Sequence, residues 1–243
     1  MDDQGIRRVV LAGVLLALTL LLVFTRIGMI PMPTPAGNAT IAHIPAIIGG
    51  LLEGPLVGLI VGLGFGFASF VNATTPMFKD PMVAILPRLF IGVVAALAYG
   101  GVRRLNKRGL SAIAGILLIV LLAAAWQIHA DKPILGIVWA VLAVALGVGL
   151  WFWLRHQELA LVRVGIAAGL GSLTNTVLVL GMAVVRQYMT APVALVTGLT
   201  HGLPEMIVSA LITIGVVAAI RNLGGRRKRR PAGTRRSGAT KEG

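Results

Sequence analysis

Several kinds of residue are scarce in this chain, and each scarcity excludes a class of chemistry. There is no cysteine, which excludes a disulfide framework, a thiolate metal site and a cysteine nucleophile. Charged residues make up only 12% of the sequence, whereas soluble domains usually carry about 25%. Because 57% of the residues are hydrophobic and the mean hydropathy is +0.91, the composition predicts an integral membrane protein.

The motifs of common catalytic sites are also missing. The sequence has no P-loop pattern GxxxxGK[ST], no HExxH and no GxSxG, so it predicts neither an ATPase of its own nor a zinc or serine hydrolase. No pair of acidic residues lies within apparent reach in the membrane. We therefore predict no enzyme, no metal site, no cofactor and no catalytic residue. The four histidines are scattered without ligand spacing: His43, His129, His156 and His201.

The excess of positive charge has a simple account in a membrane protein. There are 22 Lys and Arg residues against eight Asp and Glu, a formal net charge of +14. Membrane proteins concentrate Lys and Arg on cytoplasmic loops, so we predict a lipid bilayer and no nucleic acid as the partner of this charge.

Eight apolar segments are candidates for membrane crossings, since a spanning helix needs roughly 20 apolar residues. The second segment is short and contains Pro45, and by length alone it could be re-entrant. The segments are 9–29, 41–52, 55–71, 82–102, 110–128, 134–154, 159–185 and 204–220.

The distribution of basic residues tests this topology. With eight crossings and both termini cytoplasmic, only Arg26, Lys79, Lys132 and Arg186 lie outside. The inner set comprises Arg7, Arg8, Arg103, Arg104, Lys107, Arg108, Arg155, Arg163, Arg221 and the basic residues of the tail. The asymmetry favours this orientation and supports counting segment 41–52 as a full crossing.

Small residues form two candidate packing faces. Gly54, Gly58, Gly62 and Gly66 recur every four residues, which places them on one helix face that a neighbouring backbone can approach closely. The first helix offers a second face, which could meet another helix of this chain or of a partner. Its residues are Ala12, Gly13 and Ala17.

Polar residues in the apolar segments are the candidate binding residues, because ionisable groups in a membrane are costly and tend to face a cavity or a partner. In the predicted topology the ionisable ones lie near the outer ends of their helices: His43, Arg88, His201 and Glu205. The neutral ones lie on the same side or at mid-depth: Asn38, Thr40, Asn72 and Asn175. Together they predict a site for a polar small molecule on the outer face.

Four of these candidates also have a structural interpretation. His43 could lie at the membrane interface, and Arg88 could extend to the headgroups. Asn175 could join two helices. Glu205, which follows Pro204, could cap the first turn of its helix.

Four segments, in this order, resemble the substrate-binding S components of energy-coupling factor (ECF) transporters for vitamins. The segments are TIAHIPAIIGGLLEGPLVGLIVGLGFGFASF, LPRLFIGVVAALAY, GSLTNTVLVLG and HGLPEMIVSALIT. The resemblance covers the first four and the last two helices. It implies an all-α membrane fold of six helices in a prokaryotic plasma membrane, with a vitamin bound at the extracellular side.

The resemblance also implies partners and a mechanism. ATP would be hydrolysed by two separate ATPase subunits, and a transmembrane coupling subunit would contact the small-residue face of the first helix, Ala12, Gly13 and Ala17. The whole S component would topple in the membrane to carry the vitamin inward.

The chain departs from this family by an additional apolar hairpin, which raises the expected number of spans to eight. Because the hairpin has almost no polar groups, we expect it to face lipid. The predicted organisation is 1–109 for the first four core helices, 110–156 for the inserted hairpin, 157–222 for the last two core helices and 223–243 for a basic, disordered cytoplasmic tail.

The TIAHIP and GSLTNT segments look most like pantothenate-type S components. Arg88 or His43 could bind the carboxylate of pantothenate, and Thr40, Asn72 and Asn175 its hydroxyls. Folate, cobalamin and a hydroxymethylpyrimidine stay open as substrates. The alternative functions are a stand-alone ion-coupled secondary transporter that uses Glu205, a membrane-embedded enzyme, and a structural subunit that recruits a partner or anionic lipid through its tail.

Overall fold

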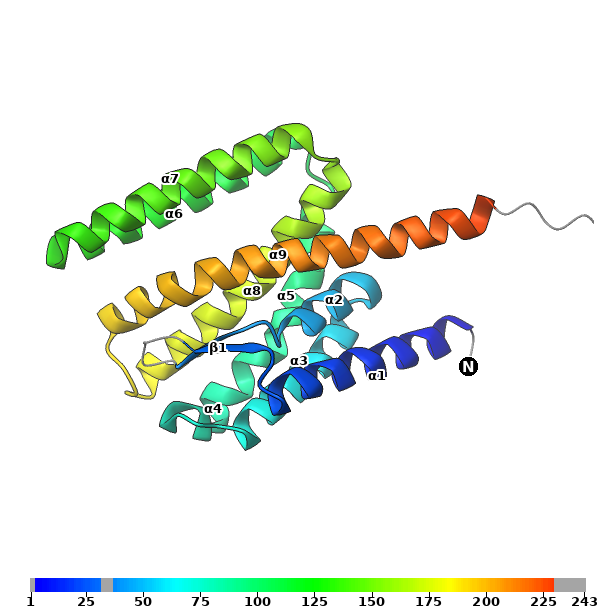
Figure 1. Cartoon of the computed structure of the whole chain (residues 1–243), viewed down its shortest axis with the longest axis horizontal. Coiled ribbons are helices and arrows are strands. Elements are labelled where there is room, and N and C mark those ends of the chain that lie inside the picture. Colours follow the sequence, from blue (N-terminus) through cyan, green and yellow to red (C-terminus); the bar gives the residue numbers. More distant parts are fainter. Residues whose placement is uncertain (1–2, 32–36, 230–243) are drawn as a thin grey trace, which may run out of the picture.

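A computed structural model describes residues 3–31 and 37–229 of the chain, with side chains as far as Arg221. These residues form a helical bundle with one short two-stranded ladder (Figure 1). The helices are α1 (Asp3–Phe24), α2 (Ile44–Glu53), α3 (Pro55–Val71), α4 (Pro81–Ala84), α5 (Leu86–Val102), α6 (Lys107–Asp131), α7 (Pro133–His156), α8 (Leu159–Val185) and α9 (Ala191–Arg229), with a 3₁₀ turn η1 (Pro76–Lys79). Strands β1 (Met29–Pro31) and β2 (Asn38–Thr40) pair antiparallel, with Met29 opposite Thr40.

Six helical stretches of the described chain are long and apolar enough to cross a membrane: α1, α4 with α5, α6, α7, α8 and α9. The count of eight spans is not confirmed, because α2 has 10 residues and α3 has 17. At 1.5 Å per residue α2 is only about 15 Å long, half the thickness of a hydrocarbon core of about 30 Å. Most of α2 is nevertheless buried inside the protein, which shields it from lipid.

The predicted glycine row packs helices against one another, as its spacing indicates. A Cβ atom on Gly58 would collide with the backbone of Gly92 in α5, and one on Gly62 would collide with the carbonyl oxygen of Arg88. Gly50 of α2 meets Gly92 in the same way. Gly54 is different, since it lies between α2 and α3 with φ of 96°, a left-handed conformation that favours glycine. The close crossing of α2, α3 and α5 fixes the start of α5 beside α3.

The last helix begins earlier than the sequence indicates. The apolar segment 204–220 predicts a helix start at Pro204, because proline is favoured in a first turn, but α9 begins at Ala191 and Pro204 lies inside it. This interpretation is wrong because a membrane helix tolerates proline where neighbouring groups satisfy the freed backbone. Glu205 consequently does not cap a first turn. The helix continues to Arg229, so the start of the predicted tail is helical, and residues 230–243 lie outside the described residues.

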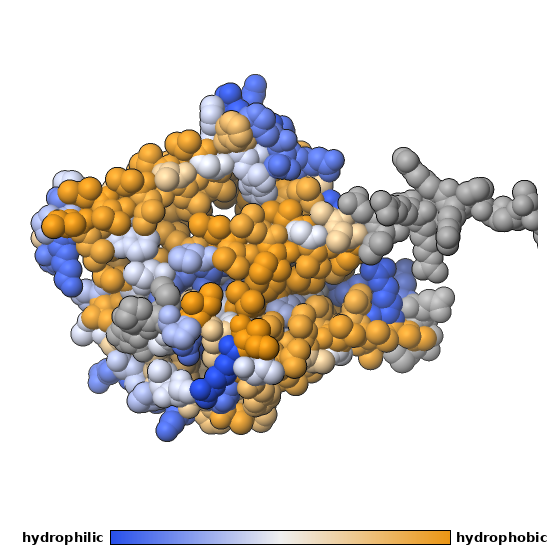
Figure 2. All heavy atoms as spheres, in the orientation of Figure 1, coloured by the Kyte–Doolittle hydropathy of each residue, from blue (hydrophilic) through white to orange (hydrophobic). Residues whose placement is uncertain are grey.

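The additional hairpin is present as α6 and α7, which lie side by side along one flank of the bundle (Figure 1). Its outward side chains are large and apolar, for example Ile119 (67% exposed) and Trp126 (75%). Figure 2 shows hydrophobic residues over this flank and over much of the molecule. Such an apolar surface fits lipid, as expected for the hairpin.

The small-residue face of α1 is divided between the inside and the outside of the bundle. Gly13 and Ala17 are exposed, and a Cβ on Gly13 would meet no atom within 4 Å. Ala12 is half-buried and packs against the core of α1, α2 and α3. Only Gly13 and Ala17 of the three predicted residues therefore lie open to a partner helix.

Candidate substrate-binding site

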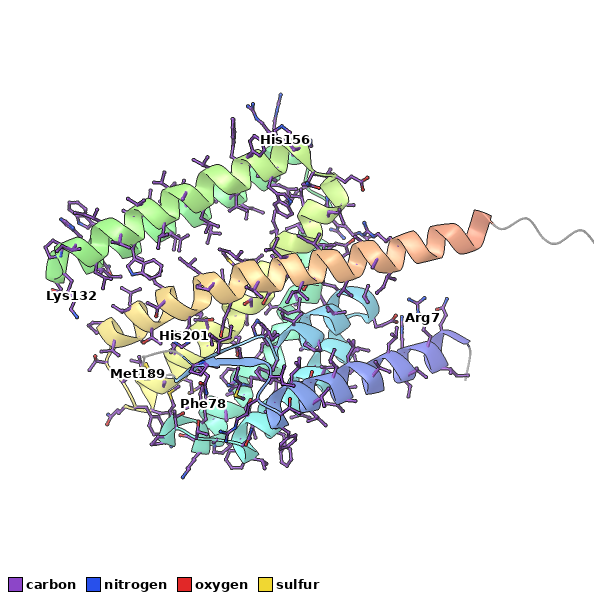
Figure 3. All side chains as sticks on the ribbon, viewed as in Figure 1. Arg7, Phe78, Lys132, His156, Met189 and His201 are labelled. Atoms are coloured by element: carbon purple, nitrogen blue, oxygen red, sulfur yellow. The ribbon has the colours of Figure 1, made fainter. Side chains whose placement is uncertain are left out.

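One pocket gathers seven of the eight predicted binding residues. It lies at one end of the bundle, between β1, β2, the end of α3, the start of α5, the second half of α8 and the first half of α9. The predicted residues that line it are Asn38, Thr40, Asn72, Arg88, Asn175, His201 and Glu205. Figure 3 shows Phe78 and His201 at this end, and Arg7 at the opposite end of the molecule.

Arg88 is held in place by main-chain groups. Its Nη1 donates to the carbonyl oxygens of Val83 at 3.2 Å and Ala84 at 2.5 Å. The guanidinium lies 4.9 Å from the ring centre of Phe65 and 4.8 Å from that of Phe78, within the range of cation–π attraction. Because Arg88 is only 4% exposed, it does not extend to the headgroups.

The pocket contains a carboxylate as well as this cation. Glu205 is buried and its Oε1 accepts a hydrogen bond from the backbone N–H of Thr40 at 2.6 Å. This bond ties β2 to α9 and closes one side of the pocket. Arg88 and Glu205 thus place a guanidinium and a carboxyl group in one largely buried site, where polar interactions are stronger than in water.

His43 does not line the pocket. It is fully buried, and its Nε2 lies 3.0 Å from Ser172 Oγ and 2.9 Å from Ser209 Oγ. The interface interpretation of His43 is therefore wrong. The ring joins the start of α2 to α8 and α9 next to the pocket, and it is 6.5 Å from the ring of Phe65.

The asparagines of the pocket have different surroundings. Asn72 donates from Nδ2 to the carbonyl oxygen of Val23 at 3.0 Å, so it ties the end of α3 to the end of α1. Asn38 Nδ2 is 4.0 Å from Met29 Sδ across the strand pair. Asn175 is buried, and its Oδ1 has no hydrogen-bond partner within the described part of the chain.

Sequence reasoning missed other residues of the pocket wall: Met29, Phe65, Ser69, Phe78, Thr176 and Thr197. Thr176 could be predicted from the sequence, since it belongs to the polar run GSLTNT. Phe65 carries no such signal, because an aromatic residue in an apolar stretch packs equally well against lipid or protein. Phe78 lies in the loop between two apolar segments, where no local pattern points to the pocket.

An ion pair joins the two loops beside the pocket. Arg186 Nε donates to Asp80 Oδ2 at 2.6 Å, and the hydroxyl of Tyr188 is 3.4 Å from the same oxygen. Asp80 Oδ1 also accepts from the backbone N–H of Met82 at 2.9 Å, which caps α4. The loop before α4 is thereby fastened to the loop between α8 and α9.

The pair predicts a pH-dependent contribution to stability. The hydrogen bond from Arg186 holds the pKa of Asp80 below its ordinary value of 3.8. The contribution is therefore present above about pH 3.8 and is lost as the pH falls through the lower pKa of the folded protein. We expect Asp80→Asn to lower the apparent Tm near neutral pH, and the gap from wild type to shrink below about pH 3.8. Thermal melts of both proteins across this pH range measure the difference in apparent Tm. A difference that does not change with pH would contradict a stabilising ion pair between Asp80 and Arg186.

The comparisons with known proteins agree with this arrangement. The model of the family described as "ECF transporter, substrate-specific component" matches residues 7–217. No curated protein matches the chain. The family match covers most of the sequence and includes every residue of the pocket. This chain belongs to the family of substrate-specific components of ECF transporters.

Proposed function

We propose that the pocket binds a water-soluble vitamin or vitamin precursor, with pantothenate as the first candidate. Membership of the family makes the chain a substrate-binding membrane subunit that works with ECF coupling and ATPase modules. The choice among substrates depends on the chemistry of the pocket wall.

The observation that carries the proposal is the buried guanidinium of Arg88. It lines the pocket, and its Nε has no hydrogen-bond partner among the described residues. A buried polar group without a partner costs free energy, and a ligand carboxylate would supply a charge-assisted hydrogen bond to it. Pantothenate has such a carboxylate.

The opposite wall suits hydroxyl groups. Glu205 and the unpartnered Oδ1 of Asn175 are acceptors, and the hydroxyls of pantothenate are donors. Phe65 and Phe78 supply apolar surface next to the guanidinium. This combination favours a ligand with a carboxylate at one end and hydroxyls at the other. Folate, cobalamin and a hydroxymethylpyrimidine are the other substrates to test.

The arrangement of charges supports a pocket on the outer face. Arg7 and Arg8 pair with Glu53 at the end of the bundle away from the pocket, at 3.3 and 3.7 Å. We place that end and both termini on the cytoplasmic side of a prokaryotic plasma membrane, following the positive-inside rule.

The same contacts support eight passes of the chain. Strand β2 begins beside the pocket, and α2 ends at Glu53 next to the start of α1. Through β2 and α2 the chain runs from the pocket end of the bundle to the opposite end. Through α3 it runs back to the pocket end. We propose the core 1–109 and 157–222 with the hairpin 110–156 inserted, and exposed Gly13 and Ala17 as the surface for the coupling subunit.

Titration of the detergent-purified full chain against a panel of vitamins tests the proposal. We expect tight, saturable binding of one vitamin, pantothenate first, by calorimetry and thermal shift, without ATP or an ion gradient. No binding across the panel by a folded, monodisperse sample would contradict it. Proton-dependent uptake by the chain alone would instead favour a secondary transporter that uses Glu205.

A further inference from the structure

A second cavity separates the hairpin from the core of the bundle. It lies between α6 and α7 on one side and α8 and α9 on the other, and its volume is about 360 Å³. Apolar side chains line it, among them Leu117, Leu146, Trp153 and Leu211. In Figure 2 an opening is visible between the hairpin and the rest of the molecule. We refer to this cavity as the hairpin cleft.

The hairpin is attached to the core at both ends of the cleft. At one end Trp139 packs in a cluster with Leu199 and Leu203 of α9. At the other end Leu110 and Leu154 pack in a cluster that includes Val162 of α8. The two attachments hold the hairpin beside α8 and α9, and all four helices that border the cleft are long and apolar enough to cross a membrane.

The length of the cleft corresponds to one lipid leaflet. On α7 its wall runs from Ala145 to Leu154, which is about 15 Å along the helix. Half of a hydrocarbon core of about 30 Å is the same length. The wall ends at Leu154, directly before Arg155, so one end of the cleft coincides with the polar end of the helix.

Positive charge gathers at that end. The loop and helix ends next to it carry Arg103, Arg104, Lys107, Arg108 and Arg155. The ion pairs of the described residues involve none of these five. Arg155 instead lies over the ring of Trp151, 4.0 Å from its centre.

Few carboxylates oppose this charge. Between residues 103 and 163 the acidic residues are Asp131, which ends α6 at the far end of the hairpin, and Glu158. The basic end of the cleft therefore has a surplus of cations where lipid headgroups lie, and clusters of this kind attract anionic lipids.

We propose that the hairpin cleft binds an anionic phospholipid, with one acyl chain along α7 and the phosphate against the basic residues at its end. The fit depends on three matched properties: an apolar wall, the length of one leaflet, and cations where the headgroup would lie. The proposal is independent of which vitamin the other pocket binds.

A glycine in the wall allows a direct test. Gly149 lines the cleft and is exposed, and a Cβ there would meet no atom within 4 Å. Gly149→Phe therefore adds a ring to the wall of the cleft at a position where the Cβ has open space. Gly181→Phe is the matched control, because Gly181 of α8 is also exposed with open space around it and does not line the cleft.

The experiment is native mass spectrometry of the full chain after incubation with phosphatidylglycerol or phosphatidylcholine of identical acyl composition. We expect wild type and Gly181→Phe to retain one phosphatidylglycerol, about tenfold or more in excess over phosphatidylcholine. Gly149→Phe should lose this retention. The double variant Lys107→Gln with Arg108→Gln should keep the acyl site but lose the preference for the anionic headgroup.

Equal retention of the two lipids by wild type would overturn the proposal, as would full retention of phosphatidylglycerol by Gly149→Phe. A dimer mass in place of bound lipid would assign the cleft to a second copy of the chain. Circular dichroism and a monodisperse elution profile check that each variant is folded. If Gly149→Phe does not fold, the double variant decides the outcome.

Discussion

Arg88→Ala should lower the affinity for pantothenate by at least about 30-fold, the equivalent of about 2 kcal/mol, because removing one partner of a buried charge pair costs about 2–5 kcal/mol. Isothermal calorimetry of the detergent-purified protein measures the change. The same affinity in both proteins would mean that the carboxylate does not pair with Arg88.

A control is needed because Arg88 also holds the end of α4. Its Nη1 bonds to Val83 and Ala84 would be lost in the alanine variant, and the apparent Tm without ligand reports that loss. Arg88→Lys keeps the charge but not the planar fork of donors. We expect its affinity to lie between those of wild type and Arg88→Ala, whereas a purely structural role would give no correlation between charge and affinity.

The second large effect is expected at Gly92, where α2, α3 and α5 meet. A Cβ there would collide with the backbone of Gly58 and with the carbonyl oxygen of Ala46. Since backbone atoms cannot move aside as the tip of a side chain can, Gly92→Ala should destabilise the fold by about 1–3 kcal/mol or more. We expect the apparent Tm to fall by about 5 °C or more.

Gly100→Ala is the matched control for this change. Gly100 lies in the same helix, is exposed, and has open space where its Cβ would be. Alanine should stabilise the helix there by about 0.5–1 kcal/mol. Equal melting temperatures for the two variants would show that the helix crossing does not depend on the glycine at position 92.

The features that the sequence predicts correctly depend on short spacings. A repeat of four glycines places Gly58 and Gly62 on one face whatever the rest of the chain does. The two helices α6 and α7 follow from two apolar runs and a tight link. Polar residues in apolar runs, such as Arg88 and Asn175, indicate the pocket because their burial needs partners.

The features that it misses depend on contacts between distant segments. His43 meets serines 129 and 166 positions away, which no local pattern reveals. The span count depends on where α2 and α3 end, and the hydropathy of the sequence does not show that α2 has only 10 residues. The sequence does not show where α9 starts, because proline occurs both in the first turn of a helix and inside membrane helices, and Pro204 fits either position.

Helix α9 is long enough to connect the pocket with the opposite end of the protein. Its 39 residues measure about 58 Å, nearly twice the hydrocarbon thickness, and it contains both Glu205 and Arg221. These two residues are about 24 Å apart along the helix, so a tilt of about 10° about Glu205 moves Arg221 by about 4 Å. The contact of Arg221 Nη2 with the Tyr99 hydroxyl is 3.4 Å long and would not survive such a movement. One continuous helix thus connects the wall of the pocket with the contact of Arg221 at the other end of the protein.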